Sequence, residues 1–486
     1  MPRRPRLGVE PASRAPAGVL AAIVATYCVV FGWLTWQQHS NYGTFGYDMG
    51  LHDQGIWLTS RLTRPFVTIR GMHYFGHHVN LVSLLYVPAY RLGGGPHLLY
   101  LSETVVLATG AVPVWLLARE RLASAWWALA PAGALLLYPA LQWMNWWHWH
   151  PETLAITPLL FAWWFALRRR WGWFTAAVGL ALATKEDVAL AVLMLGVVLF
   201  VFRRERRAGA LTAAAGLGWF LICTRVVIPT LLGGIPFYER DLFPAFGDSL
   251  GSVLVGMVTQ PADVWRMATD HDRLVYYSKL LGPLAWLPLF GAPFLLIAGP
   301  QLGVNVLSAL PGTHDIRFQY SAVPVAAMFI ASVEALGWMA RVRPALARFA
   351  VVTMVISSIA ANVAWSPSPA GRDYDTGIWA KRVPRHDSFD AAVAMVPADA
   401  GVSASYYLIP HLTHRRYAYE WPNPWILGNW GVESEPPPHP STVDFLVIDT
   451  TLGQEPQLLG ARTGPDGEFD VLFERDGVLV AKRRGR

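Results

Sequence analysis

Long apolar segments alternate with short polar loops over the first three quarters of the chain. Several of these segments are shorter than the roughly 20 residues that a helix needs to cross a bilayer. In total, the apolar segments cover residues 17–36, 78–92, 97–118, 123–140, 153–167, 171–184, 187–202, 208–228, 275–290, 292–310, 319–339 and 346–364. The pattern predicts an all-α polytopic membrane bundle over residues 17–365.

Basic clusters follow several of the apolar segments, and such clusters are typical of cytoplasmic loops. This places the N-terminal tail, residues 1–16, inside the cell. The loops then predicted to lie outside are 37–77, 141–152, 184–187, 229–274 and 311–318. The segment 78–92 is short and contains Pro88, so we interpret it as interfacial or re-entrant, which leaves about 11 crossings. The alternative is a twelfth crossing with one basic cluster outside.

The composition changes after residue 365, where apolar runs shorten to strand length. Asp476-Gly477 is typical of a tight hairpin turn, and Asp387 or Ser388 is predicted to cap a helix that runs to Val396. The predicted strands are 400–408, 443–449, 469–474 and 478–482. Residues 366–486 are therefore predicted to form a small extracytoplasmic α/β domain.

Composition supports a membrane protein. Hydrophobic residues make up 53% of the 486 residues and charged residues only 15%, which argues against a soluble multidomain protein. The net charge of +6 lies in clusters between apolar segments, so it indicates topology and not a nucleic-acid partner. Cys28 and Cys223 both lie in apolar segments, where packing is the simplest role for them.

Two acids and a histidine follow the first apolar segment, in the loop 37–77. Asp48, His52 and Asp53 are spaced so that a short helix would bring His52 near Asp48 on one face. A carboxylate at the outer mouth of a helix bundle can take a proton from a substrate hydroxyl. Asp48 is therefore the candidate catalytic base and Asp53 a second candidate. The alternative is a solvated loop in which an acid caps the helix.

A second group of candidates combines imidazoles with a carboxylate. His77 and His78 lie close to the start of the segment 78–92, and His148, His150 and Glu152 lie in the turn of a membrane hairpin. Imidazole and carboxylate groups bind divalent cations, but they also suit contacts with a sugar or a phosphate. The candidate ligands of a divalent metal ion are Asp48, His78, His150 and Glu152.

Three consecutive charges, Lys185, Glu186 and Asp187, interrupt the apolar stretch 171–202. Charges at membrane depth are costly unless they pair with one another or serve a site. Two short helices would place these charges in a cavity, where Lys185 could neutralise a phosphate and an acid could hold the lysine in place. The alternative is a structural ion pair in a hairpin turn.

Three residues near the outer ends of later segments complete the candidate set. Arg225 and Arg317 carry guanidinium groups that suit bidentate contact with phosphate. Tyr320 follows Arg317 in the same short loop. An arginine at a helix end also snorkels to the interface, so Arg225 has a purely structural alternative.

The ordered set of motifs resembles the DUF2079 family of bacterial membrane proteins. The strings that carry the resemblance are Asp48 to Trp57, Gly76 to His78, His148 to Glu152, Lys185 to Asp187, Tyr320 to Ala322, Val402 to Ser405 and Pro410 to Arg415. The resemblance extends to the GT-C glycosyltransferase superfamily, whose members use polyprenyl-phosphate sugars. It implies an essential acid in the first external loop, and Asp48 in Tyr47-Asp48-Met49-Gly50 is the matching position.

Together these observations favour a glycosyltransferase of the cytoplasmic (inner) membrane. The expected donor is a polyprenyl-phosphate sugar, and the expected acceptor is a hydroxyl of a cell-envelope glycan, lipid or protein. Membrane lipid is an expected partner and nucleic acid is not. Two alternatives stay open: a transporter or flippase of a lipid-linked substrate, and a non-catalytic cell-envelope assembly protein.

Overall fold

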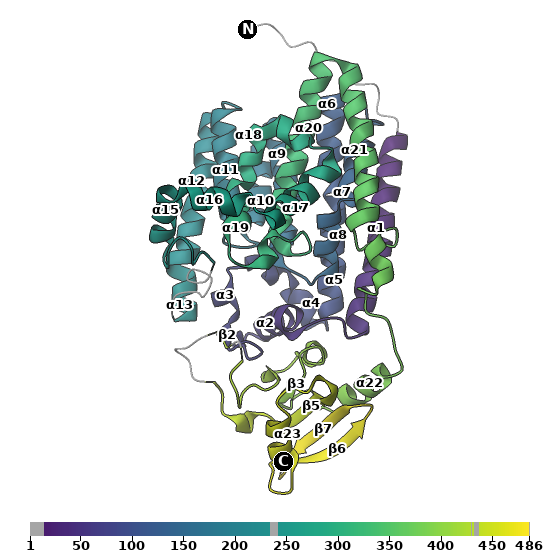
Figure 1. Cartoon of the computed structure of the whole chain (residues 1–486), viewed down its shortest axis with the longest axis vertical. Coiled ribbons are helices and arrows are strands. Elements are labelled where there is room, and N and C mark those ends of the chain that lie inside the picture. Colours follow the sequence, from purple (N-terminus) through teal and green to yellow (C-terminus); the bar gives the residue numbers. More distant parts are fainter. Residues whose placement is uncertain (1–13, 234–241, 429, 432–436, 486) are drawn as a thin grey trace. The chain divides into compact units, whose positions relative to one another are not determined.

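The computed structural model describes residues 14–233, 242–428, 430–431 and 437–485 (Figure 1). Residues 1–13 of the predicted cytoplasmic tail lie outside these ranges. The chain divides into two compact units. Unit 1 comprises residues 1–33, 101–222 and 237–378, and unit 2 comprises residues 34–100, 223–236 and 379–486.

Unit 1 is a bundle of α-helices, and its first two, α1 and α5, extend into unit 2. They are α1 (Arg14–Ser40), α5 (Pro96–Thr109), α6 (Ala111–Leu122), α7 (Leu129–Leu136), α8 (Pro139–Trp146), α9 (Ile156–Leu167), α10 (Trp171–Leu182), α11 (Val188–Val201), α12 (Arg206–Ile222), α15 (Leu250–Thr259), α16 (Pro261–Ala268), α17 (His271–Leu281), α18 (Ala292–Leu295), α19 (Gly299–Leu307), α20 (Ala322–Val342) and α21 (Pro344–Trp365). This architecture confirms the prediction of a mainly helical chain.

Six helical stretches among the described residues are long and apolar enough to cross a membrane. They are Arg14–Ser40, Pro96–Leu122, Arg206–Leu232, Leu287–Leu307, Gln319–Val342 and Pro344–Trp365. Three shorter apolar helices are Pro151–Leu167, Trp171–Leu182 and Val188–Val201. The total of about 11 crossings stays a prediction. The segment 78–92 forms only a short 3-10 helix, Leu81–Tyr86, and α4 (Val87–Arg91), which agrees with a segment that does not cross.

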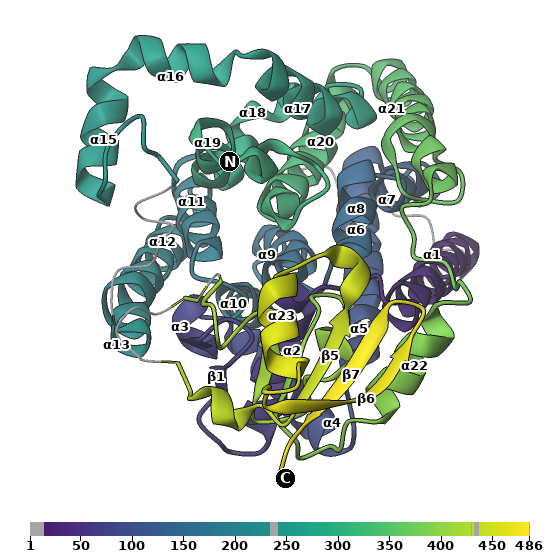
Figure 2. The ribbon, with the colours of Figure 1, turned by 60° about the horizontal axis from the view of Figure 1, so that its bottom comes forward.

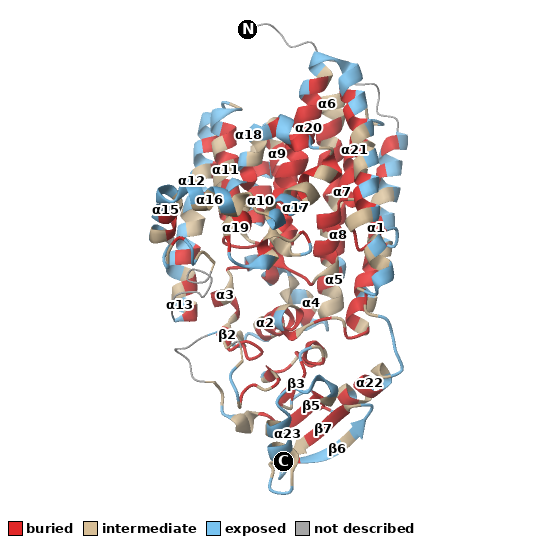
Figure 3. Ribbon diagram, in the orientation of Figure 1, coloured by how far each residue is buried: buried red, intermediate tan, exposed pale blue. Residues whose placement is uncertain are grey.

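Helix α20 lies in the core of unit 1 and is almost entirely buried (Figure 3). Its sequence is rich in alanine, and it packs against α6, α9 and α21. The buried Glu334 of α20 accepts two hydrogen bonds from Arg121, at 3.0 and 2.7 Å, and one from the indole of Trp163. The negative charge of Glu334 inside the bundle is thus compensated by the adjacent positive charge of Arg121, as burial requires. Apolar residues such as Val29 of α1 and Phe349 of α21 are instead exposed.

Proline interrupts two of the predicted apolar segments. The segment 123–140 does not form one helix, because Tyr138 is extended before Pro139 and a new helix starts there. The segment 275–290 likewise ends its α-helix at Leu281, and Pro283 lies in the 3-10 turn that follows. Apolar composition alone does not reveal such breaks.

Unit 2 contains a five-stranded mixed sheet with the strand order β4-β3-β5-β7-β6. Its strands are β3 (Val402–Ala404), β4 (Ala418–Glu420), β5 (Phe445–Asp449), β6 (Phe469–Arg475) and β7 (Val478–Arg483). Helix α22 (His386–Ala394) packs on β7, and α23 (Pro456–Thr463) packs on β6 (Figure 2). Strands β3, β4 and β5 are mutually parallel, and β5, β7 and β6 are antiparallel neighbours.

The remaining elements of unit 2 are short. They include a π-helical turn (Gly46–Gly50), α2 (Leu51–Ser60), the hairpin of β1 (Phe66–Val67) and β2 (Met72–His73), α3 (Tyr74–His77), a second π-helical turn (Cys223–Val227) and α13 (Ile228–Leu232). The side-chain hydroxyl of Thr68, beside β1, accepts from the amide of Ala418 and donates to its carbonyl, at 2.9 and 2.7 Å. The first loop and the C-terminal sheet are therefore bonded to each other within one unit.

The predicted C-terminal elements are largely confirmed, with three corrections. The hairpin turn at Asp476-Gly477 is present, and both residues have positive φ. The predicted strand 400–408 covers only Val402–Ala404, because Leu408 bonds back to Ser405 in a turn. Strand β4 was not predicted. The cap of α22 is Arg385 and neither Asp387 nor Ser388, because the helix begins at His386, two or three residues earlier than those caps predict.

Candidate functional site

Asp48 lies in the π-helical turn Gly46–Gly50, which follows α1 and leads directly into α2. The amide of Gly50 closes the turn on the carbonyl of Phe45 at 3.0 Å. Asp48 itself is half-buried, and its neighbour Tyr47 is 39% exposed. A short helix, α2 (Leu51–Ser60), thus follows the first apolar segment, and Asp48 lies in the turn before it; the approach of His52 to Asp48 stays a prediction.

Two residues far apart in sequence lie with Asp48 in unit 2. Arg70 is buried in the turn between β1 and β2, and its guanidinium lies over the Tyr47 ring, 3.5 Å from the centroid. Glu420 ends strand β4. Burial lowers the pKa of Arg70, and the charges of Glu420, Tyr47 and Asp48 act in the opposite direction. Burial raises the pKa of Glu420, Arg70 opposes this, and Asp48 adds to it. The charges of the two acids and of the arginine therefore influence one another.

Asp53, the second candidate acid, is fully buried and holds the loop to the C-terminal segment. Its carboxylate accepts hydrogen bonds from the hydroxyl of Tyr90, at 2.7 Å, and from the hydroxyl of Thr413. The Nε2 atom of His414 lies 3.1 Å from the same carboxylate. Burial lowers the pKa of His414, but the charge and hydrogen bond of Asp53 raise it by more. This environment is that of an anchoring carboxylate.

The histidines of the first loop lie near the same elements. The Nδ1 atom of His52 is 3.1 Å from the hydroxyl of Tyr74, at the start of α3. His77 ends α3, and its ring lies 4.2 Å from that of His78. The second π-helical turn, Cys223–Val227, belongs to the same unit and carries the exposed Arg225.

Lys185, Glu152 and Asp187 form a largely buried cluster in unit 1. The Nζ atom of Lys185 lies 2.8 Å from Oε1 of Glu152 and 3.5 Å from Oδ2 of Asp187. The same nitrogen is 6.0 Å from the centroid of the Tyr320 ring. Glu186 is also buried in this turn. The turn predicted between two short helices is confirmed, since α10 ends at Leu182 and α11 begins at Val188.

Glu103, which the sequence analysis did not select, lies next to this group. It is fully buried in α5, and its Oε1 accepts from the hydroxyl of Thr153 at 2.5 Å. Thr153 also donates to the carbonyl of His150, and Nδ1 of His150 lies 2.9 Å from the carbonyl of His148. A single acid in an apolar helix is itself a signal of function, and that signal could have identified Glu103.

Arg317 pairs with a residue outside the Lys185 cluster. Its guanidinium pairs with Asp315 at 2.6 Å, and its side chain is 54% exposed. Tyr320 follows in the 3-10 turn Gln319–Ser321, which contacts the turn Pro151–Ala155 that carries Glu152. The loop therefore contributes Tyr320 to the cluster and leaves Arg317 at the surface.

Among the described residues, no three His, Cys, Asp or Glu side chains gather in a group that could hold a metal ion. Of the four candidate ligands, Asp48 and His78 belong to unit 2, and His150 and Glu152 belong to unit 1. Metal binding therefore stays a prediction, and so does a meeting of Asp48 with His150 and Lys185.

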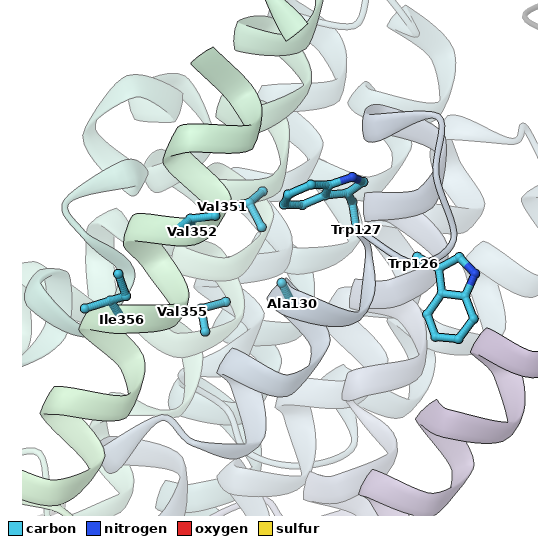
Figure 4. Close-up of a pocket in the computed structure, with 7 residues that line it drawn as sticks. All are labelled: Trp126, Trp127, Ala130, Val351, Val352, Val355 and Ile356. Carbon is cyan, nitrogen blue, oxygen red and sulfur yellow. The ribbon is translucent and has the colours of Figure 1, made fainter. Parts of the chain in front are cut away.

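A groove of a different kind lies on unit 1, with a volume of about 310 Å³ (Figure 4). Its lining is apolar: Trp126, Trp127, Ala130, Val351, Val352, Val355 and Ile356. It includes none of the candidate residues and offers no acid, base or cation, so it does not qualify as a reaction site.

The family described as "Predicted membrane protein (DUF2079)" matches residues 39–480 of the chain. No curated protein matches the sequence significantly. The structure is similar to that of ArnT from Cupriavidus metallidurans in the apo state, with a TM-score of 0.54 and 16% identity, over 96% of this chain and 98% of that one. The Archaeoglobus fulgidus oligosaccharyltransferase in the apo form gives a TM-score of 0.44 and 13% identity, over 98% and 75% of the chains. The likeness to ArnT is a likeness of fold.

Proposed function

We propose that this chain, which belongs to the DUF2079 family of predicted membrane proteins, is a membrane glycosyltransferase that uses a polyprenyl-phosphate sugar. The observation that carries the proposal is the position of Asp48. It lies in the first turn after the first membrane helix, in a chain whose fold is similar to that of ArnT over 96% of its length. The acceptor would be a hydroxyl group outside the cytoplasmic membrane, on a glycan, lipid or protein of the cell envelope.

In the proposed reaction, the carboxylate of Asp48 takes the proton of the acceptor hydroxyl. The acceptor oxygen then forms a bond to the anomeric carbon, and the bond from that carbon to the phosphate oxygen breaks with inversion. The phosphate leaves with the electron pair of the broken bond. Asp48 suits the role of base because it is half-buried at the mouth of the loop, whereas Asp53 already accepts three hydrogen-bond donors in a fully buried site.

The leaving phosphate would be stabilised by cations of the candidate set. An ammonium group has three donors, so Lys185 can bind an anion while its bond to Glu152 persists. Arg225 is exposed and is the second candidate cation, and Arg317 is the third. His52, His77, His78, His148 and His150 are proposed to contact the donor or a divalent metal ion. Glu186 and Asp187 are proposed to hold Lys185 in place.

The test uses membranes of the source organism, which contain the natural acceptor, and a panel of polyprenyl-phosphate donors with labelled sugars. Asp48→Asn should lower transfer by about 100-fold or more, the usual contribution of a general base. Asp466→Asn, in an exposed turn of the C-terminal segment, is the matched control and should leave transfer unchanged. Unchanged transfer by Asp48→Asn at equal protein amount would exclude Asp48 as the base.

Absence of transfer with every donor would favour the transporter interpretation. Movement of a labelled lipid-linked donor across proteoliposomes then tests that alternative directly. A reporter fused after residue 486 tests the proposed orientation. A cytoplasmic signal from that reporter would place the C-terminal segment inside the cell and would contradict an external reaction site.

A further inference from the structure

The apolar groove of unit 1 lies between α21 and the turn that precedes α7 (Figure 4). Helix α7 packs against α21, which is one of the stretches long and apolar enough to cross a membrane. Trp127 reaches from the turn toward Val351, and the Val352 and Ile356 side chains on the α21 wall are exposed. Because the bilayer core holds no water, a groove in such a helix surface is filled by hydrocarbon chains.

Hydrogen bonds fix the turn that carries the two tryptophans of the groove. The indole Nε1 of Trp115, in α6, donates to the carbonyl of Ala125 at 3.0 Å. The hydroxyl oxygen of Ser124 accepts from the amide of Trp127 at 3.4 Å. The groove is therefore a formed concave surface, and a ligand does not have to order the turn in order to bind.

Arginines flank one end of the groove. Arg348 of α21 is exposed and precedes Val351 and Val352 by three and four residues, so it lies on the same face of the helix, one turn nearer the N-terminus. On the other wall, the guanidinium carbon of Arg119 lies 4.9 Å from the centre of the Trp115 ring, whose indole holds the turn. An apolar groove with positive charge at one end is complementary to a lipid with a negatively charged head group.

The walls of the groove contribute no acid that could neutralise these arginines. The chain contains no Asp or Glu over residues 121–151 or over residues 335–372, which include the turn, α7 and α21. The acids that directly precede these two segments each pair with another arginine at 2.7 Å: Glu120 with Arg168, and Glu334 with Arg121. The positive charge at the end of the groove therefore favours an anionic group of a ligand.

We propose that the groove binds one acyl chain of an anionic phospholipid, with the lipid phosphate at Arg348 and Arg119. A phospholipid is favoured over the polyprenyl-phosphate donor, because these arginines belong to the basic clusters predicted to be cytoplasmic, whereas the donor would react outside. The inference goes beyond the proposed transfer reaction and does not depend on it.

The first test compares two lipids that differ in head-group charge. The full-length protein in detergent is titrated with phosphatidylglycerol, which is anionic, or with phosphatidylcholine, which has no net charge, and native mass spectrometry measures the bound lipid. The wild type should bind phosphatidylglycerol at least about fivefold more tightly, the usual effect of one basic side chain near a charged membrane surface. Arg348→Gln should weaken phosphatidylglycerol binding about fivefold and leave phosphatidylcholine binding unchanged. Arg207→Gln changes an exposed arginine of α12 and is the matched control, which should alter neither.

The second test fills the groove without removing a charge. Ala130→Trp places an indole among the lining residues. It should weaken phosphatidylglycerol binding about tenfold or more, because the loss of two buried methylene groups already has this effect. Ala360→Trp is the matched control, since Ala360 is exposed on α21 and is not among the lining residues. It should leave lipid binding unchanged.

Equal affinity of the wild type for the two phospholipids would overturn the inference, and so would unchanged phosphatidylglycerol binding in Arg348→Gln or in folded Ala130→Trp. If Ala130→Trp yields no folded protein, Arg348→Gln decides alone: weaker phosphatidylglycerol binding supports the inference and unchanged binding overturns it. Polyprenyl phosphate is then added as a competitor. If an equimolar amount displaces most of the phosphatidylglycerol, the assignment to a phospholipid is wrong, and if it does not, the assignment is supported.

Discussion

The charged residues of the two units are stabilised in different ways. In unit 1, Lys185 and Glu152 are both deeply buried and bond directly at 2.8 Å. In unit 2, Asp48 is half-buried, and the buried Arg70 lies over the ring of its neighbour Tyr47. The first arrangement is a buried ion pair, and the second leaves a carboxylate that is only half buried.

This difference distinguishes two roles of a charged residue in a membrane protein, a structural role and a chemical role. A buried pair compensates its own desolvation and can serve structure alone. An acid that is only partly buried can be reached by a substrate and is suited to accept a proton. The comparison also applies inside unit 2, where Asp53 is closed off by three donors and Asp48 is not buried to the same degree.

The largest expected effect is in unit 1. Lys185→Met leaves the carboxylate of Glu152 buried without its cation, so we expect a loss of about 3–5 kcal/mol in stability. Thermal unfolding of the purified protein in detergent measures this loss. The double variant Lys185→Met/Glu152→Gln removes the stranded charge and should recover most of the stability. A single variant as stable as the wild type would show that the pair is not closed.

The next effect compares the two acids of the first loop. Asp53→Asn replaces one acceptor oxygen by a donor among Tyr90, Thr413 and His414, so it should cost about 3 kcal/mol. Asp48→Asn should cost less than about 1 kcal/mol, because its site is half-exposed. The two variants are compared by the same thermal unfolding assay. The reverse order of stability would exchange the roles assigned to the two acids.

A smaller effect is expected where the first loop meets Trp430. Gly71 has φ of +59°, and a Cβ atom there would overlap the Trp430 ring. Gly71→Ala should therefore cost about 2 kcal/mol, from backbone strain and from displacement of the indole. Gly453→Ala is the matched control, because its φ of +60° is similar and its surroundings are open. Equal losses in the two variants would mean that Trp430 does not constrain the loop.

The smallest effect is the pH dependence that His414 brings to unit 2. Asp53 raises the pKa of His414 above the ordinary value of 6.5, so the folded protein binds the proton more tightly than the unfolded chain. The resulting stabilisation is fully present below pH 6.5 and is lost as pH rises through the folded pKa. Because the side chain is 39% exposed, we expect less than about 1 kcal/mol. His414→Gln should remove this dependence in unfolding curves measured from pH 5 to 9.

Most of the local structure follows from the sequence. The turn at Lys185 was predictable because charges inside an apolar stretch force a break, and the hairpin at Asp476-Gly477 because these residues tolerate positive φ. The break at Pro139 was missed, although proline is itself a signal. Arg70 and Glu420 were also missed. Each is a single charge among uncharged residues of a loop or short strand, and no motif in the sequence marks either for a role.

The sequence by itself determined the apolar segments, the turn of charges at Lys185, the acid after the first helix and the membership of a membrane-protein family. These features depend on composition and on short-range spacing, which the chain carries without its fold. Only the tertiary structure decided that Asp53 is an anchor, that Lys185 bonds Glu152, and that Arg70 lies over the ring of Tyr47. Such partners are chosen by long-range packing, because burial makes each charge depend on the neighbours that the fold brings to it.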